Sequence, residues 1–143
     1  MFDGCAGLVG VWKLLACDTE YQDSGAREPY FGAAAPAGYL ALTPEGCLIA
    51  LLVGWDRAPG QTDERQAALF RTMVAYAGRY RLEGDKLTTT VDVSWNEAWT
   101  GTEQVRFYSL DGDRLHIVTA WLPHPADPQQ RMMRARLSFE RAK

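Results

Sequence analysis

The sequence GRYRLEGDKLTTTVDVSWNEAWTGTEQVRFYSLDGDRLHIVT, residues 78–119, decides the fold. It contains four strand-like segments, separated by the turns Glu83-Gly84-Asp85 and Asp111-Gly112-Asp113 and by a loop from Asn96 to Gly101. Connections this short pair each strand with the next one in an antiparallel meander. Because the open edges of a sheet invite aggregation, a meander this regular usually closes into a barrel or a sandwich.

The segments on either side of this meander supply the strands that close the sheet. Four of them have strand-like patterns: Leu8 to Tyr21, Ala37 to Leu42, Cys47 to Val53 and Arg131 to Arg141. In the last segment the apolar residues alternate with charged or polar ones, which is typical of a strand with one buried face. We therefore predict an all-β fold, an eight-stranded antiparallel up-and-down barrel, which is the size that holds one small ligand.

The first segment is apolar on both of its faces. Strict alternation puts Trp12, Leu14 and Ala16 on one face and Val11, Lys13, Leu15 and Cys17 on the other. A strand that reads this way has a covered outer face. We therefore expect that this outer face is buried in a homodimer.

Between the third and the fourth strand-like segments, the spacing of the apolar residues changes to that of a helix. Thr62 is a suitable N-cap residue, and the acidic Asp63 and Glu64 suit the positive end of a helix dipole. Apolar residues then recur at helical spacing from Leu69 to Ala77. We predict one helix here, placed to plug or cover one end of the barrel.

Composition limits the class of protein. The 143 residues predict a single domain over residues 1–143, and the net charge of -3 argues against a nucleic-acid-binding protein. No apolar run approaches the ~20 residues of a membrane span, and the first residues do not have the pattern of a secretion signal. The cysteines (Cys5, Cys17 and Cys47) and the histidines (His116 and His124) lack the spacing of metal ligands. We expect a cytoplasmic protein with reduced thiols, no metal and no cofactor.

A series of short motifs, in order along the chain, resembles one family. Gly10-Val11-Trp12 is followed by Gly38-Tyr39-Leu40, Thr43-Pro44-Glu45-Gly46, Tyr76-Ala77-Gly78-Arg79-Tyr80, residues 99–107 and residues 110–115. Together they look like the lipocalin-like domain family of small bacterial and fungal proteins, and the likeness covers nearly the whole chain. It implies one eight-stranded barrel, usually without disulfides, that binds a small molecule. Some small barrels in biosynthetic clusters act as cofactor-free cyclases.

The resemblance also implies one structural contact. In lipocalins an arginine near the end of the barrel packs over the Gly-x-Trp indole, which here predicts a cation–π contact between Arg141 and Trp12. The family often carries histidine in the strand after the helix, where this chain has Thr89-Thr90. No role of those imidazoles is carried over.

The tryptophans are the first candidates for a binding site. Trp55, Trp95, Trp99 and Trp121 all lie at or just beyond the ends of strand-like segments. They either fill the core of the barrel or ring one of its mouths, as an aromatic rim for a flat or polycyclic ligand.

Three tyrosines are the next candidates. Tyr76 and Tyr80 share one face of a strand, and we expect Tyr39 to share the lumen with them. Their hydroxyls either orient a ligand or meet backbone partners.

The segment that carries Gln104 and Arg106 can face either way. Its apolar pattern turns Val105 and Phe107 inward and Gln104 and Arg106 outward. The resemblance repeats a glutamine and an arginine at these positions, which implies a polar lumen and the opposite phase.

A polar lumen also reverses the neighbouring segment, so that Thr90, Asp92 and Ser94 face inward. A buried arginine needs a partner, and Asp92 is the natural one for Arg106. Arg106 would then bind a carboxylate or an enolate, with Tyr80 or Asp92 as the proton carrier.

The leading hypothesis is a barrel that binds a small, largely hydrophobic molecule. Its candidate ligand-binding residues are Tyr39, Tyr76, Tyr80, Trp95, Gln104, Arg106 and Trp121. The alternative is a cofactor-independent cyclase or isomerase for a polyketide-like or aromatic metabolite, with Tyr80, Asp92 and Arg106 as catalytic candidates. A tyrosine or carboxylate of raised pKa in an apolar lumen would favour the enzyme. A third possibility is a filled barrel with a structural role.

Overall fold

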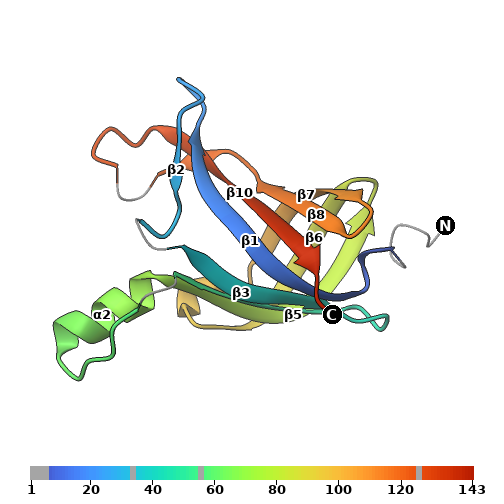
Figure 1. Ribbon diagram of the computed structural model, residues 1–143, viewed down its shortest axis with the longest axis horizontal. Helices are drawn as coiled ribbons and strands as arrows, with labels where there is room; N and C mark the ends of the chain where they lie inside the picture. Colours follow the sequence, from blue (N-terminus) through green and yellow to red (C-terminus); the bar gives the residue numbers. More distant parts are fainter. Residues whose placement is uncertain (1–6, 33–34, 55–56, 125–126) are drawn as a thin grey trace.

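Eight long strands form a closed antiparallel barrel. The computed structural model of the protein describes residues 7–32, 35–54, 57–124 and 127–143. The long strands are β1 (Gly10–Tyr21), β3 (Pro36–Leu42), β4 (Cys47–Gly54), β5 (Met73–Glu83), β6 (Lys86–Ser94), β7 (Glu103–Asp111), β8 (Arg114–Thr119) and β10 (Met132–Arg141). Each pairs with the next, and β1 pairs with β10 to close the ring (Figure 1). The predicted all-β barrel is confirmed.

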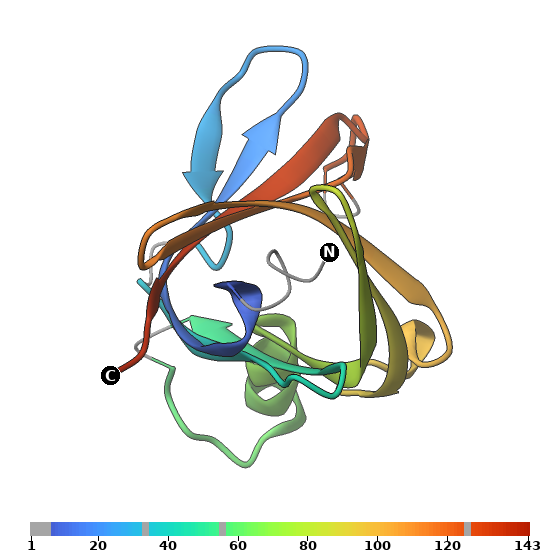
Figure 2. The same ribbon diagram turned by 90° about the vertical axis from the view of Figure 1, so that its right-hand side faces the viewer.

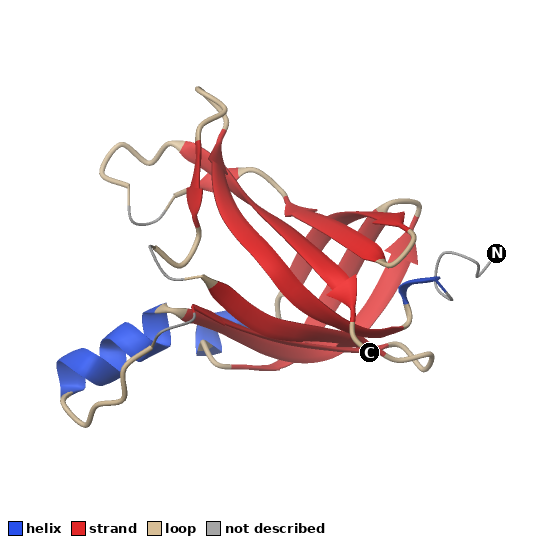
Figure 3. Cartoon of the chain, in the orientation of Figure 1, coloured by secondary structure: helices blue, strands red, loops and turns tan. Residues whose placement is uncertain are grey.

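Two short strands extend the sheet at one end of the barrel. β2 (Arg27–Pro29) pairs with the end of β1, and β9 (Leu122–Pro123) pairs with the start of β10. Figure 3 shows the strands as one continuous ring with the connecting loops at its two ends. The sequence predicts the helix between the third and the fourth strand. Because the short strand β2 is counted here, the helix lies between β4 and β5.

The helix α2 (Asp63–Arg71) begins as expected and ends earlier than expected. The Thr62 hydroxyl accepts a hydrogen bond from the backbone N–H of Arg65, so the predicted N-cap is confirmed. At the other end the backbone N–H of Thr72 donates to the carbonyls of Ala68 and Leu69. No helix in the described part of the chain combines the length and the apolar character that a membrane crossing requires.

The predicted extension of the helical face from Leu69 to Ala77 is wrong. From Met73 onward the chain is β5, paired with β4 from Val53 opposite Met73 to Cys47 opposite Arg79. The apolar residues of this region fit both a helical and an alternating period, and pairing with the edge of β4 decides between them. The helix does not plug the barrel either, because none of its residues is buried and it projects from one end (Figure 1).

The phase of β1 also differs from strict alternation. Its register against β10 shifts between Leu14 and Ala16, which marks a β-bulge. Trp12 and Leu14 are buried before the bulge, and Cys17 and Thr19 are buried after it. The expectation that Cys17 shares a face with Val11 is therefore wrong, because one extra residue turns the second half of the strand over.

One end of the barrel is sealed by the contact that the Gly-x-Trp motif implies. The guanidinium carbon of Arg141 lies 4.2 Å from the centre of the Trp12 ring, and Trp12 is fully buried. Arg141 also donates to the carbonyls of Val9 and Gly7, at 3.0 and 2.8 Å. Figure 2 looks at this end, where the blue segment that begins at Gly7 crosses the ring of strands. The predicted Arg141–Trp12 pair is confirmed.

Gly10 makes room for this arrangement. Its φ is +137°, and a Cβ at this position would lie 2.8 Å from Nη1 of Arg141. A side chain here would therefore strain the backbone and displace the guanidinium.

We predict that Arg141→Met lowers the free energy of unfolding by about 2–4 kcal/mol, because it removes a cation–π contact and two charge-assisted hydrogen bonds. Urea unfolding followed by circular dichroism measures the change. Arg114→Met is the matched control, since Arg114 is exposed and no hydrogen bond or ion pair of its side chain is seen in the described structure. Equal stability of the two variants would contradict the sealing role of Arg141.

Candidate functional site

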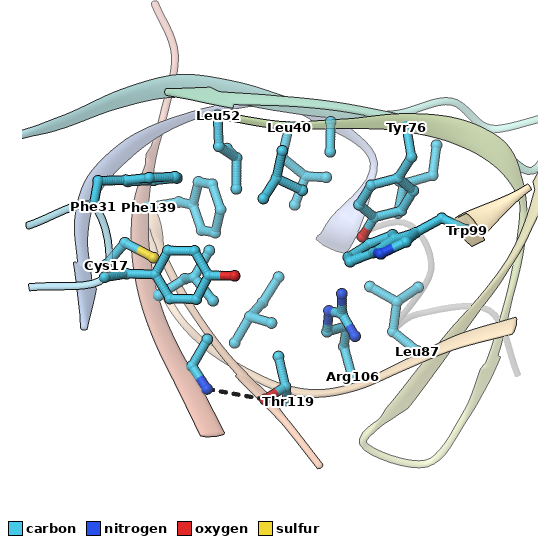
Figure 4. A pocket seen from close by; sticks show the side chains of 17 residues that line it. Cys17, Phe31, Leu40, Leu52, Tyr76, Leu87, Trp99, Arg106, Thr119 and Phe139 are labelled. Atoms are coloured by element: carbon cyan, nitrogen blue, oxygen red, sulfur yellow. Dashed lines mark hydrogen bonds between the residues drawn. The ribbon is translucent and has the colours of Figure 1, made fainter. Parts of the chain in front are cut away.

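A cavity of about 70 Å³ occupies the barrel interior, and 17 side chains line it. They come from β1, the turn after β2, and all the other long strands, together with Trp99 (Figure 4). Most are apolar: Phe31, Leu40, Leu48, Ala50, Leu52, Val74, Leu87, Ile117, Ala135, Leu137 and Phe139. The polar or amphipathic members are Cys17, Tyr30, Tyr76, Trp99, Arg106 and Thr119.

Arg106 points into this cavity, so the apolar interpretation of β7 is wrong. Its partners on the neighbouring strands are Leu87 and Thr119, and all three side chains line the cavity. Tyr108 and Leu110 of the same strand pack against the buried core. The residues between them therefore face outward, and the phase that the resemblance implies for this strand is the correct one.

On the neighbouring strand β6, Thr90 and Asp92 do not face the lumen, although Arg106 of β7 does. Leu87 and Val91 are buried in the core, whereas Asp92 is exposed. The apolar pattern is correct for β6 from Leu87 to Val91, where Thr89 is also buried. The register against β5 then shifts, and Val93 is 61% exposed. The expected ion pair between Asp92 and Arg106 is not formed, since the two side chains lie on opposite faces of the wall.

Arg106 has few partners in the described structure. Its Nη1 donates to the carbonyl of Val105 at 3.0 Å, and its Nη2 lies 3.5 Å from Oε1 of Gln104. Its guanidinium carbon lies 5.9 Å from the centre of the Trp99 ring. Among the ion pairs of the described residues, none includes Arg106. A guanidinium has five N–H donors, so most of them have no protein acceptor here.

Aromatic side chains cover the cavity on the side of Arg106. Trp99 belongs to the short helix η1 (Glu97–Trp99), and its ring centre is 5.4 Å from that of Tyr76 and 4.9 Å from that of Trp95. Trp95 donates through Nε1 to the carbonyl of Phe70, which ties this cluster to α2. Tyr76 is only 9% exposed, and Figure 4 shows its hydroxyl directed toward the lumen.

Tyr30 and Phe31 are lining residues that the sequence did not indicate. They lie in the turn after β2, where a loop with Pro and Gly gives no periodic signal. The rings of Tyr30 and Phe31 are 5.0 Å apart and nearly perpendicular. Tyr30 is 39% exposed overall, yet burial around its hydroxyl raises the pKa of that group, with Cys17 adding to the rise and Arg106 opposing it. The hydroxyl therefore lies within the electrostatic reach of Arg106.

Cys17 is the other lining residue that the sequence missed, because the bulge of β1 could not be seen there. Burial raises the pKa of the Cys17 thiol to about 12, so the group is a neutral thiol at physiological pH. Among the residues that the structure describes, no three Cys, His, Asp or Glu side chains are placed to hold a metal ion.

The structure separates the remaining candidate residues from the cavity. Tyr39 is 52% exposed on the outer face of β3, and the expectation that it shares the lumen is wrong. Tyr80 faces inward, and its hydroxyl donates to the carbonyl of Thr43 at 2.6 Å, near the sealed end. Trp121 lies under the outward-facing guanidinium of Arg134, at 4.3 Å.

Gln104 and Trp95 lie beside the cavity and do not line it. Gln104 bridges Arg106 and the hydroxyl of Thr102, and Trp95 packs behind Trp99. Trp55, the fourth tryptophan of the predicted rim, lies outside the described residues. The site therefore brings together Tyr76, Trp99 and Arg106, with Trp95 and Gln104 as their neighbours.

The solved structures that match the chain share little of its sequence. A redesigned beta barrel is 10% identical, with 96% of this chain and 94% of that chain covered and a TM-score of 0.46. An uncharacterized protein from Bacteroides eggerthii is 14% identical, with 94% and 98% covered and a TM-score of 0.46. A mutant of the fluorescent protein UnaG is 14% identical, with 94% and 96% covered and a TM-score of 0.39.

None of the curated proteins matches the chain. The model of the lipocalin-like domain family matches residues 9–142, which is nearly all of the sequence. This match agrees with the closed barrel and with the Arg141–Trp12 contact at its sealed end. The chain belongs to the lipocalin-like domain family.

Proposed function

We propose that this protein binds a small, largely hydrophobic molecule inside the barrel. The observation that carries the proposal is the cavity, whose lining is mostly aliphatic and aromatic with a few polar groups. Ligand sites in proteins have this composition, because apolar contacts supply affinity and a few polar groups supply orientation. A cavity of about 70 Å³ suits a compact molecule.

Small residues at inward positions support binding over a filled barrel. Ala50 lies in the middle of β4, directly between Leu40 of β3 and Tyr76 of β5, and all three line the cavity. Ala135 has the same role on β10. Protein interiors are normally packed without voids larger than a water molecule, so the space left by these alanines calls for an occupant.

The arrangement of the two ends gives a ligand one direction of access. Trp12, Leu8 and Arg141 close one end. At the other end the cavity is bounded by Tyr30 and Phe31 of one turn and by Trp99 of another. Loops can move more easily than paired strands, so a ligand would enter between these turns.

We predict that Ala50→Leu abolishes binding, because the larger side chain fills the space that a ligand needs. Thermal-shift measurements with neutral aromatic molecules, such as indole and naphthalene, test this against the wild type. A ligand at 100 times its dissociation constant should stabilise the wild type by about 2.7 kcal/mol and should leave the variant unchanged.

Ala68→Leu is the matched control for this experiment, because Ala68 is exposed on α2 and does not line the cavity. The control should bind as the wild type does. If Ala50→Leu and the wild type respond equally to every molecule that binds, the lumen is not the binding site.

The alternative function, a cofactor-independent cyclase or isomerase, is favoured by Tyr30. Burial raises the pKa of this tyrosine, and it faces the same apolar cavity as Arg106. A raised pKa keeps the hydroxyl protonated at neutral pH, so Tyr30 would polarise a carbonyl by donating a hydrogen bond. Among the described residues that line the cavity, there is no carboxylate or imidazole that would accept a proton, which makes binding the better supported function.

Turnover distinguishes the two functions. For an enzyme, molecules found by thermal shift would be converted to isomers or cyclised products that mass spectrometry and chromatography resolve, and Tyr30→Phe would slow the conversion. For the binding protein that we propose, these molecules are recovered unchanged after incubation with the wild type.

The homodimer expected from the sequence gains support from the outer face of the barrel. Tyr39 of β3 lies beside Leu51 of β4 and Ala75 of β5, and in the next row Ala41, Ile49 and Ala77 lie side by side. Tyr39, Ile49 and Leu51 are about half exposed, at 52%, 51% and 49%. With Val11 they leave on the order of 400 Å² of apolar surface, within the range of functional patches on monomers.

We propose a second copy of this chain as the occupant of that face. The large side chains of β3 and β4 form a ridge, and the alanines of β5 leave a trough beside it. A twofold axis parallel to the strands would place the ridge of each copy in the trough of the other.

The predicted compartment is the cytoplasm, and the free thiols Cys17 and Cys47 suit it.

We predict that the wild type sediments as a dimer at micromolar concentrations and that Leu51→Glu sediments as a monomer, because a charge in the apolar ridge opposes its burial. Ser109→Glu, an exposed residue on β7 outside this patch, should leave the dimer intact. A wild type that is monomeric throughout this range would rule the dimer out.

A further inference from the structure

Arg106 is a charge inside an otherwise apolar wall. Of the 17 residues that line the cavity, it is the one that carries a permanent charge. Its neighbours in the cross-strand row are Leu87 and Thr119, and the Thr119 hydroxyl is engaged by the backbone N–H of Ala135 and by the carbonyl of Ala120. Both neighbours are neutral, so neither compensates the charge of the guanidinium.

The guanidinium is also poorly satisfied by the rest of the protein. The shorter of its two protein hydrogen bonds goes to the carbonyl of Val105, and the longer one, at 3.5 Å, goes to the amide of Gln104. Both acceptors are neutral. A cation removed from bulk water without a counter-ion is costly, and a ligand that supplies the opposite charge would offset that cost.

Two further hydroxyls accompany Arg106 on the lining. Tyr76 packs against Trp99, whose ring lies under the guanidinium, and Tyr30 feels the charge of Arg106 electrostatically. For neither hydroxyl does the described structure show a hydrogen-bond partner, and both side chains line the cavity. Figure 4 shows the Tyr76 hydroxyl, Trp99 and Arg106 on one side of the lumen, with Cys17, Phe31 and Phe139 on the opposite side.

We propose that the ligand is a small hydrophobic carboxylic acid, bound as its anion with the carboxylate on Arg106 and with hydrogen bonds from the hydroxyls of Tyr76 and Tyr30. This proposal rests on the proposed binding function and names the class of ligand. The apolar body of the acid would lie against Leu52, Ile117 and Phe139.

The chemistry of the lining favours a carboxylate monoanion. The planar guanidinium fork matches the two oxygens of a carboxylate, which allows two parallel hydrogen bonds. A dianion such as a phosphate monoester would bring a second charge for which the lining has no cation. A neutral molecule would leave the charge of Arg106 uncompensated.

Matched pairs of ligands test the proposal directly. Isothermal titration calorimetry would compare cinnamate with cinnamamide, and octanoate with octanamide, at neutral pH. The wild type should bind each acid roughly tenfold to a hundredfold more tightly than its amide, as expected for hydrogen bonds to a charged group. In Arg106→Met this preference should disappear, while the affinity for the amides is kept or increased.

Arg114→Met serves as the control for the loss of one positive charge, because Arg114 is exposed at the start of β8. It should keep the preference for acids. Tyr76→Phe should reduce the affinity for the acids several-fold and the affinity for the amides less, because a hydrogen bond to a charged group is the stronger one. This gives a second variant should Arg106→Met fail to fold.

The outcomes separate this proposal from the one on which it rests. If the wild type binds acids and amides equally, Arg106 does not recognise a carboxylate, and binding of hydrophobic molecules in general stands. If acids are preferred and Arg106→Met retains the preference, the anion is bound elsewhere and the proposal is overturned. If no member of either pair binds to the wild type, both proposals fail.

Discussion

The stacking of Arg141 on Trp12 is the contact on which the barrel depends. It joins β10 to the start of β1, where the ring of strands closes, and the same guanidinium ties the incoming segment through the carbonyls of Gly7 and Val9. Gly10 lacks the side chain that would block this approach. With one end sealed in this way, any space left in the core becomes a pocket that opens toward the other end.

That division explains where the chemistry of this protein lies. Near the sealed end, the Tyr80 hydroxyl is satisfied by the carbonyl of Thr43 and the Trp12 indole by the carbonyl of Leu8. The buried hydroxyls of Thr88 and Thr89 on β6 show no hydrogen-bond partner in the described structure. Around the cavity, the Tyr76 hydroxyl and most donors of Arg106 remain available in the described structure. Polar groups inside a protein are usually paired, so a guanidinium with few partners and a tyrosine hydroxyl with none in the described structure, both beside an apolar cavity, support the binding site that we propose.

Sequence reasoning recovered the strands because their alternation and their turns are local signals. It recovered Arg141 on Trp12 through a family resemblance, which also implied the inward phase of Arg106, and it placed Tyr76 on the lumen face of its strand. It misplaced Cys17 because a single-residue bulge reverses a strand without changing its composition. It missed Tyr30 and Phe31 because a loop can fold into a lumen only through tertiary contacts. The two phases of β7 could not be separated by pattern, since an inward arginine there is an exception to hydrophobic burial.

A methyl-resolved NMR titration with cinnamate tests the central claim most directly, because the barrel carries aliphatic side chains on both faces of the same strands. Our account predicts chemical-shift changes at Leu52, Ile117 and Ala135, which line the cavity. Ile49 and Leu51, which are exposed on the outer face of β4, should keep their positions. Changes confined to Ile49 and Leu51, or an unchanged spectrum at saturating ligand, would contradict the account.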